Sequence, residues 1–173
     1  DFIFSVFDYQ HKKVKELIRY LKNHNDFLLK KEISIHMSEH VIDYLSDQQS
    51  MLYFMNPIVI PVPISNKRLR ERGFNQTHLL AKYFAKNIDG IYKKNILYKH
   101  RQTRKQALIK NRNERFQNIK NAFTIKTKQS ERLKNKDIII IDDLSTTGAT
   151  LLEIKKLLKK SGARNVIAVT IAH

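Results

Sequence analysis

The segment that decides the fold is residues 138–150, which read IIIIDDLSTTGAT. Four isoleucines in a row are typical of a strand that is buried on both faces, as in a parallel sheet covered by helices. Two acidic residues, Asp142 and Asp143, follow at the carboxyl end of this strand, where open α/β sheets bind their ligands. A short turn rich in hydroxyl groups then leads into a helix predicted over residues 149–160.

The turn at residues 145–150 has the composition of a phosphate site. Unpaired backbone N–H groups and the dipole at the start of a helix favour a phosphate, and Gly148 permits close approach of the backbone. Carboxylates beside a phosphate would repel it unless they accept hydrogen bonds from sugar hydroxyls or help to hold a divalent cation. A ribose 5-phosphate would satisfy both halves of the segment. The alternative interpretation is an acidic pair that caps the following helix.

The rest of the chain alternates strand and helix patterns. Apolar runs predict strands, and apolar residues at helical spacing predict helices. The predicted strands cover residues 2–9, 58–63, 95–98, 138–141 and 166–171, and the predicted helices cover residues 14–21, 29–45, 74–88 and 149–160. This order predicts an α/β fold with a parallel sheet covered on both faces. The polar residues 46–50 divide the chain into an N-terminal subdomain, residues 1–50, and a core, residues 51–173.

The positive charge is concentrated in the middle of the chain. The sequence holds 33 basic and 16 acidic residues, a net charge of +17. Residues 65–120 carry 16 of these basic and 3 of these acidic residues, a net charge of +13. Such a segment either faces an anion or forms a solvated loop. A codon usage rich in Lys, Asn and Ile is the alternative explanation.

Residues 101–120 are polar and basic, and we predict a loop there. Its cations are candidates for an electrostatic groove that binds the backbone of a nucleic acid. These candidates are Arg101, Arg104, Lys105, Lys110, Arg112 and Arg115.

Several classes of protein are excluded or disfavoured. The chain has no Cys, which excludes disulfides and thiolate metal sites and favours a reducing compartment such as the cytoplasm. Its apolar runs are far shorter than the roughly 20 residues of a membrane helix, so we expect no membrane insertion. The chain begins with Asp1 and has no signal pattern, so we expect a trimmed chain without a secretory signal. His36 and His40 lack a third ligand, and we expect ordinary surface or packing residues.

The motif DDLSTTGAT at residues 142–150 resembles the phosphoribosyl pyrophosphate (PRPP) binding motif of type I phosphoribosyltransferases. FDY at residues 7–9, PVP at residues 61–63 and KRLRERGFNQ at residues 67–76 make nearly the whole chain similar to the ComF competence-protein family. The resemblance implies a type I phosphoribosyltransferase fold, in which helices cover both faces of a parallel sheet and a small N-terminal subdomain forms a hood.

The resemblance also implies roles for individual residues. The two acids would hold the ribose hydroxyls, the turn after them the 5-phosphate, and the segment after residue 62 the pyrophosphate, whose oxygens suit arginine forks. The implied PRPP-binding residues are Asp142, Asp143, Ser145, Thr146, Thr147, Gly148, Ala149 and Thr150. The implied pyrophosphate loop contains Pro63, Ile64, Ser65, Arg68, Arg70 and Arg72. Mg²⁺ would accompany the pyrophosphate. Family members usually begin with a four-cysteine zinc module, and because this chain has no Cys we expect no zinc in it.

The resemblance therefore leads us to expect a PRPP-binding, phosphoribosyltransferase-like protein of the competence and DNA-uptake system. Single-stranded DNA in the cytoplasm is the expected macromolecular partner, and other competence proteins are further candidates. Two alternatives stay open: a nucleic-acid-binding module without transfer chemistry, and an active transferase of nucleotide salvage that adds ribose 5-phosphate to a base. Some purine phosphoribosyltransferases place a base-like Asp where this chain has Thr146, so the catalytic residues stay open, as do the acceptor and the oligomeric state.

Overall fold

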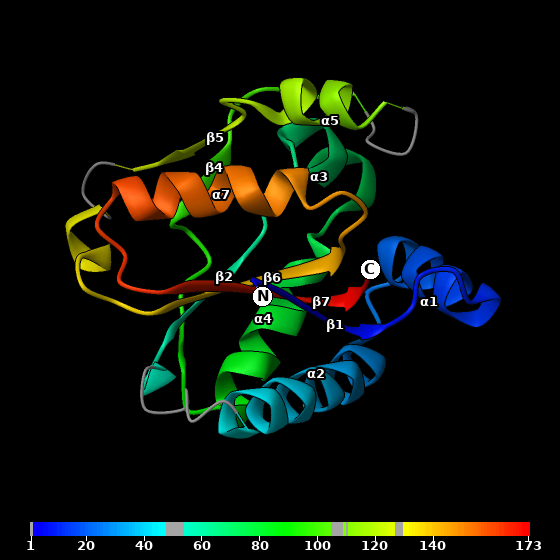
Figure 1. Ribbon diagram of the computed structural model, residues 1–173. Coiled ribbons are helices and arrows are strands. Elements are labelled where there is room, and N and C mark those ends of the chain that lie inside the picture. Colours follow the sequence, from blue (N-terminus) through cyan, green and yellow to red (C-terminus); the bar gives the residue numbers. More distant parts are fainter. Residues whose placement is uncertain (1, 48–53, 105–108, 110, 127–129) are drawn as a thin grey trace.

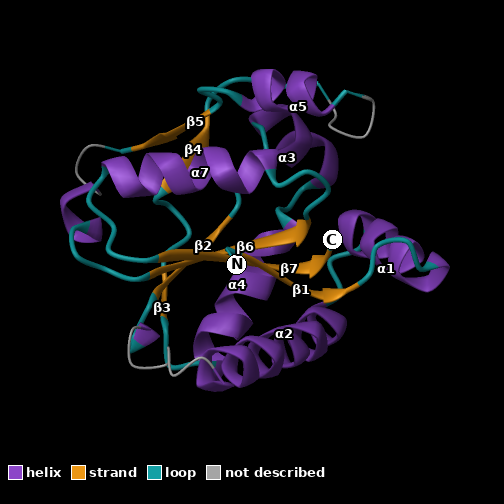
Figure 2. Cartoon of the chain, viewed as in Figure 1, coloured by secondary structure: helices purple, strands orange, loops and turns teal. Residues whose placement is uncertain are grey.

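The computed structural model describes residues 2–47, 54–104, 109, 111–126 and 130–173. Its centre is a five-stranded sheet in the order β1-β7-β6-β2-β3, and every neighbouring pair is parallel (Figures 1 and 2). The strands are β1 (Ile3–Phe7), β2 (Ile58–Pro61), β3 (Ile91–Tyr92), β6 (Ile138–Leu144) and β7 (Val166–Ala172). The predicted parallel sheet is confirmed.

Helices cover both faces of the sheet, and the isoleucines of β6 pack alternately on the two faces. Ile138 and Ile140 pack in one apolar cluster with α7 (Ala149–Lys160) and with a two-stranded hairpin. That hairpin consists of β4 (Leu97–Lys99) and β5 (Phe123–Ile125). Ile139 and Ile141 pack in a second cluster with α1 (Lys12–Asn23), α2 (Phe27–Asp47) and α4 (Gln76–Asn87). A strand with two buried faces requires apolar residues at every position, which explains the unbroken run.

Two helices occupy segments that were expected to be loops. α3 (Asn66–Arg72) begins after Ser65, whose side chain accepts a hydrogen bond from the Arg68 N–H, and ends at Gly73, whose φ is 76°. α5 (Arg112–Ile119) begins after Asn111, whose side chain accepts a hydrogen bond from the Asn113 N–H at 2.8 Å. The loop prediction is therefore wrong for residues 66–72 and 112–119, because caps rather than apolar periodicity define these short helices. A 3-10 turn, η3, covers Glu131–Leu133.

Some of the N-terminal elements belong to the main sheet and its helical cover, and one lies beyond the carboxyl ends of the strands. β1 pairs with β7 as an edge strand of the main sheet, and α2 packs along α4. Only α1 lies beyond the carboxyl ends of β1 and β7, where a hood would lie (Figure 1). The boundary at residue 50 falls outside the described residues, so the division into residues 1–50 and 51–173 stays a prediction.

The carboxyl end of β6 extends further than expected. The strand continues through Asp142 and Asp143 to Leu144, and β7 accompanies it in register, with Asp142 opposite Thr170 and Leu144 opposite Ala172. Both acids therefore belong to the pleated strand and not to the loop after it. In the part of the chain that the structure describes, no helix is long and apolar enough to cross a membrane.

Candidate functional site

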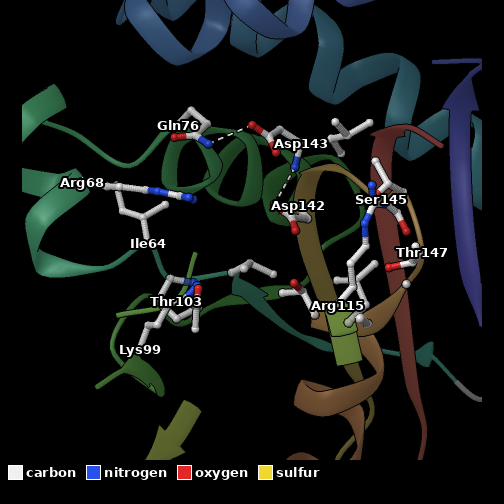
Figure 3. Close-up of a pocket in the computed structure, with 18 of the residues that line it drawn as sticks. Ile64, Arg68, Gln76, Lys99, Thr103, Arg115, Asp142, Asp143, Ser145 and Thr147 are labelled. Atoms are coloured by element: carbon white, nitrogen blue, oxygen red, sulfur yellow. Dashed lines mark hydrogen bonds between the residues drawn. The ribbon is translucent and has the colours of Figure 1, made fainter. Parts of the chain in front are cut away.

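A cavity of about 510 Å³ lies at the carboxyl ends of β2 and β6 (Figure 3). Its lining combines the turn after β6 with side chains from α1, α3 and the β4–β5 hairpin region. The charged groups of this lining are Lys22, Arg68, Arg72, Lys99, Arg104, Arg115, Asp142 and Asp143. Because six cations face two acids there, the charge of the cavity favours an anionic ligand.

The turn at residues 145–150 forms one wall of the cavity, and all six of its residues line it. Gly148 has a φ of 70° and begins α7 without a side-chain cap in the described structure, so the first N–H groups of the helix lack a capping acceptor. A Cβ at Gly148 would lie 3.0 Å from Ile3 Cδ1. The local backbone thus requires glycine and presents N–H donors at a helix start, as a phosphate site needs.

Ser145 adds an independent observation. Its side chain is only 3% exposed, and among the described residues its hydroxyl has no hydrogen-bond partner. A buried hydroxyl without a partner costs about 1–3 kcal/mol. An oxygen acceptor in the cavity would remove this cost, so the residues of the turn fit a phosphate.

The two acids have different surroundings. Asp142 is partly buried, and its Oδ1 accepts a hydrogen bond from the Asp143 N–H at 2.8 Å. Burial, followed by repulsion from Asp143, raises the pKa of Asp142 well above its usual value. Asp143 is 5% exposed, and its Oδ2 accepts a hydrogen bond from Gln76 Nε2 at 2.8 Å and lies 3.4 Å from Lys22 Nζ. Asp143 is therefore engaged by protein groups.

The expected pyrophosphate residues are only partly brought to the cavity. Pro63, Ile64, Arg68 and Arg72 line it, and Figure 3 shows the Arg68 side chain pointing into it. The two exceptions, Ser65 and Arg70, are absent from the lining: Ser65 caps α3, and Arg70 lies exposed on that helix.

Arg72 donates a hydrogen bond from Nη1 to Gln76 Oε1 at 3.3 Å, and burial lowers the pKa of its guanidinium. The short helix α3 thus presents two of its arginines, Arg68 and Arg72, to the cavity.

The β4–β5 hairpin and the segment between its strands contribute cavity residues that the sequence did not reveal as such. Lys99 and Thr103 line the cavity, and burial, together with repulsion from Arg68, lowers the pKa of Lys99 to about 8. Lys99 lies on β4, whose partner strand β5 was not predicted, so its place at the site could not be inferred. Lys22 was likewise missed because nothing in the sequence shows that α1 reaches the carboxyl edge of the sheet.

The candidate nucleic-acid residues are divided between the cavity wall, the region of α5 and positions outside the described residues, so the basic groove stays a prediction. Arg104 and Arg115 line the cavity, and Arg115 Nη1 donates a hydrogen bond to Thr146 Oγ1 at 3.1 Å. Arg101 Nη2 donates hydrogen bonds to the carbonyls of Asn118 and Lys120 at 2.9 and 2.8 Å, next to the end of α5. Arg112 belongs to α5, and Lys105 and Lys110 lie outside the described residues.

Acidic and histidine side chains provide little for a protein-held metal. Among the described residues, no group of three or more His, Asp and Glu could hold an ion. His36 is exposed, and its Nδ1 lies 3.3 Å from Glu39 Oε2, as expected for a surface residue. A Mg²⁺ ion that is carried by a pyrophosphate needs only one or two carboxylates, and Asp142 could be one of these.

Comparisons with known proteins agree with this geometry. Residues 76–173 match the model of the phosphoribosyl transferase domain family. The chain is 36% identical over 110 residues to competence protein F of Haemophilus influenzae, an alignment that covers 62% of this chain and 46% of that protein. It is 30% identical over 167 residues to competence protein ComFC of Streptococcus pneumoniae, covering 94% and 64% of the two chains. It is 32% identical over 108 residues to DNA utilization protein YhgH of Escherichia coli O157:H7, covering 62% and 45%.

A solved structure shows the same fold. The glutamine PRPP amidotransferase of B. subtilis superposes with a TM-score of 0.50 at 15% identity, over 82% of this chain and 26% of that one. The family match and this likeness confirm the expected phosphoribosyltransferase fold. The chain spans between 45% and 64% of the lengths of the three relatives named above.

Proposed function

Because the chain belongs to the phosphoribosyl transferase domain family and, within it, to the ComF competence-protein family, we propose that its cavity binds PRPP. One observation carries this proposal. The turn with Gly148 at the start of α7 and the buried Ser145, whose hydroxyl has no partner in the described part of the chain, share a single cavity with Arg68 and Arg72. One end of the cavity thus suits a monoester phosphate and the other a pyrophosphate.

The proposed pose follows from the donors and acceptors of the lining. The 5-phosphate accepts hydrogen bonds from the backbone N–H groups of residues 147–150 and from hydroxyl groups of the turn. Arg115 Nη1 donates a hydrogen bond to Thr146 Oγ1 and so supports this turn. The Asp142 carboxylate accepts hydrogen bonds from ribose hydroxyls. The pyrophosphate faces Arg68, Arg72 and Lys99, whose charges balance its own. Mg²⁺ would neutralise part of the pyrophosphate charge, held mainly by phosphate oxygens and water.

A thermal-shift titration with PRPP, in the presence and absence of Mg²⁺, tests the proposal. A ligand at a hundredfold excess over its Kd stabilises the folded state by about 2.7 kcal/mol. For a chain of this length, each kcal/mol raises the Tm by about 2–4 °C. We expect PRPP to raise the Tm more than either ribose 5-phosphate or pyrophosphate at equal concentration, because only PRPP occupies both ends of the cavity. An unchanged Tm at millimolar PRPP with Mg²⁺ would refute the proposal.

We further propose that the protein works with single-stranded DNA in the cytoplasm, alongside other competence proteins. The names of the relatives, competence and DNA utilization proteins, support this role, as does the charge of +13 over residues 65–120. Arg104 lines the cavity, so DNA and PRPP would compete for part of one cationic surface.

Fluorescence anisotropy with a labelled oligonucleotide tests the DNA proposal. Affinity should fall steeply with salt and should fall further in an Arg101→Gln/Arg104→Gln variant. The matched control, Lys134→Gln/Lys136→Gln, removes the same charge next to the amino end of β6, at the opposite end of the sheet. If both variants lose affinity equally, the binding is unspecific electrostatic attraction and the proposed surface is wrong.

Transfer of ribose 5-phosphate to a base is a second candidate function, and Lys99 favours it. A lysine with a pKa of about 8 in the cavity can give a proton to a leaving pyrophosphate near neutral pH. Pyrophosphate release from PRPP, measured with a panel of purine and pyrimidine bases, distinguishes transfer from binding alone. Release that depends on a base would show transfer, and a fall of at least about tenfold in Lys99→Met would assign the proton donation to Lys99. PRPP binding without base-dependent release would reject it.

A further inference from the structure

The pleat of β6 directs its two acids to opposite faces of the sheet. Successive side chains of a strand alternate between faces, so Asp143 shares a face with Ile139 and Ile141. That face packs against α1, α2 and α4. Asp142 shares the opposite face with Ile138 and Ile140, which pack with α7 and the hairpin. Asp142 and Asp143 therefore have different partners, because the pleat places them on opposite faces of the sheet.

A series of polar contacts runs from α1 to α3 through Asp143. Its Oδ2 lies 3.4 Å from Lys22 Nζ on α1 and accepts a hydrogen bond from Gln76 Nε2 at 2.8 Å. Gln76 Oε1 in turn accepts a hydrogen bond from Arg72 Nη1 at 3.3 Å. The Gln76 side chain is 3% exposed and uses both ends of its amide, so these two contacts fix its orientation. Figure 3 shows its contact with Asp143.

A second contact joins the same parts of the chain. Lys30 is fully buried, and its Nζ donates hydrogen bonds to the His24 carbonyl at 3.1 Å and to Asn25 Oδ1 at 2.9 Å. The same ammonium lies 4.4 Å from the centre of the Phe74 ring. Phe74 lies between α3 and α4, so the turn after α1 is held against the segment that carries Arg72.

We propose that Asp143 is a positioning residue and not a ribose ligand: it orients Arg72 through Gln76 and anchors α1 through Lys22. Asp142 alone then supplies the carboxylate that meets the ribose. This inference rests on the proposed PRPP site and refines it, because it assigns different roles to two acids that the family resemblance treats alike. It also gives a role to Gln76, which follows α3: its amide contacts both Asp143 and Arg72, so the position of Asp143 determines that of Arg72.

Titration of ribose 5-phosphate by calorimetry separates the two roles, with Asp142→Asn and Asp143→Asn as a matched pair. Each substitution is nearly isosteric and removes one negative charge. Loss of a carboxylate by itself favours an anionic ligand, so weaker binding can only report lost contacts to the sugar. We expect Asp142→Asn to raise the Kd at least about fivefold and Asp143→Asn to change it less than about twofold. Equal weakening by both substitutions would overturn the inference.

Binding of inorganic pyrophosphate tests whether Gln76 orients Arg72, at the α3 end of the series of polar contacts. Gln76→Leu keeps the charge and removes the acceptor of Arg72, so we expect the Kd of pyrophosphate to rise about threefold or more. The Kd of ribose 5-phosphate should change less than about twofold in the same variant. Unchanged pyrophosphate affinity would show that Gln76 does not orient Arg72.

Hydrogen exchange without ligand tests the positioning role independently of the proposed function. Asp143→Asn should speed exchange of backbone amides in both residues 12–23 and residues 66–80, at least about threefold, whereas Asp142→Asn should not. Lys22→Met should reproduce the effect in residues 12–23 alone. If the wild type binds neither probe but this exchange pattern is found, the PRPP proposal fails and the positioning role stands. Unchanged exchange in Asp143→Asn would overturn the positioning role.

Discussion

At the scale of single residues, the buried hydroxyl of Ser145 is where ligand binding and stability oppose each other. The folded protein buries this polar group without a partner among the described residues, at a cost of about 1–3 kcal/mol. A phosphate in the turn would remove the cost. The residue thus stabilises the complex at the expense of the free protein, as expected of a group selected for binding.

Ser145→Ala should therefore stabilise the free protein and weaken the complex. We expect the free energy of unfolding to rise by about 1 kcal/mol and the Kd of PRPP to rise about three- to tenfold. Urea denaturation and calorimetry measure the two effects. Ser161→Ala is the control, because the Ser161 hydroxyl already donates to the Leu157 carbonyl at 3.2 Å at the far end of α7. A destabilised Ser145→Ala variant with normal PRPP affinity would assign the hydroxyl a purely structural role.

Lys99 gives the cavity a pH dependence. The pKa of this lysine is lowered to about 8 by burial and by Arg68, so its ammonium is charged at pH 7 and mostly neutral at pH 9. Wild type should bind pyrophosphate about three- to tenfold more tightly than Lys99→Met at pH 7, and the difference should shrink as the pH rises to 9. Calorimetry at pH 7, 8 and 9 checks this. A ratio near one at all three pH values would place Lys99 outside the binding site, and a larger ratio that stays constant would contradict its lowered pKa.

Residue identities could be predicted from the sequence better than residue roles. The motif marked Asp142, Asp143 and the turn, but assigned both acids the same task. The strand was expected to end at Ile141, and only its continuation to Leu144 shows that the pleat separates them. Lys22 comes close to Asp143 through tertiary packing across 121 residues of sequence, which no local pattern encodes.

At the scale of elements, the long apolar patterns were predictive and the short polar ones were not. The strands β1, β2 and β7 and the helices α1, α2, α4 and α7 were expected close to their observed bounds because each buries apolar side chains. The two-residue edge strand β3 was not predicted, because so short a segment gives no pattern. α3 contains a single large apolar residue, Leu69, which is itself 41% exposed, so periodicity gave no signal. Its end signals, Ser65 and Gly73, were nevertheless present.

Asp137 joins the beginnings of β6 and β7. Its side chain, in a residue only 4% exposed, accepts hydrogen bonds from Arg164 Nε and from Asn165 Nδ2, each at 2.9 Å, and forms an ion pair with Arg164 Nη2. Asp137→Ala should lower the free energy of unfolding by about 1 kcal/mol because the partly buried Asn165 amide loses its acceptor, whereas the exposed Arg164 guanidinium can turn to water. Urea denaturation measures the loss. The control substitution of the exposed Lys136, Lys136→Ala, should change the free energy of unfolding by less than about 0.5 kcal/mol. A similarly small effect of Asp137→Ala would show that Asp137 does not stabilise the beginnings of β6 and β7.

In the molecule as a whole, the cations behind the net charge of +17 lie in more than one region of the fold. Six cations line the cavity, and the proposed ligand, with one monophosphate and one pyrophosphate group, would face three of them directly. Other cations, including those of residues 132–136 and the end of α7, lie near the opposite end of the sheet. The sequence localised the charge to residues 65–120 but treated the phosphate and nucleic-acid candidates as separate. The fold places Arg104 and Arg115 in the same cavity as Arg68, so the two proposed functions would share a surface.

A crystal structure of the protein with PRPP and Mg²⁺ tests the central claim most directly, because it shows which end of the ligand each wall holds. We expect one PRPP molecule in the cavity of about 510 Å³, with its 5-phosphate on the backbone N–H groups of residues 147–150. Asp142 should contact the ribose hydroxyls, and Arg68 and Arg72 should contact the pyrophosphate. A reversed ligand, with the pyrophosphate in the turn, or a cavity that holds no PRPP at saturating concentration would contradict the account.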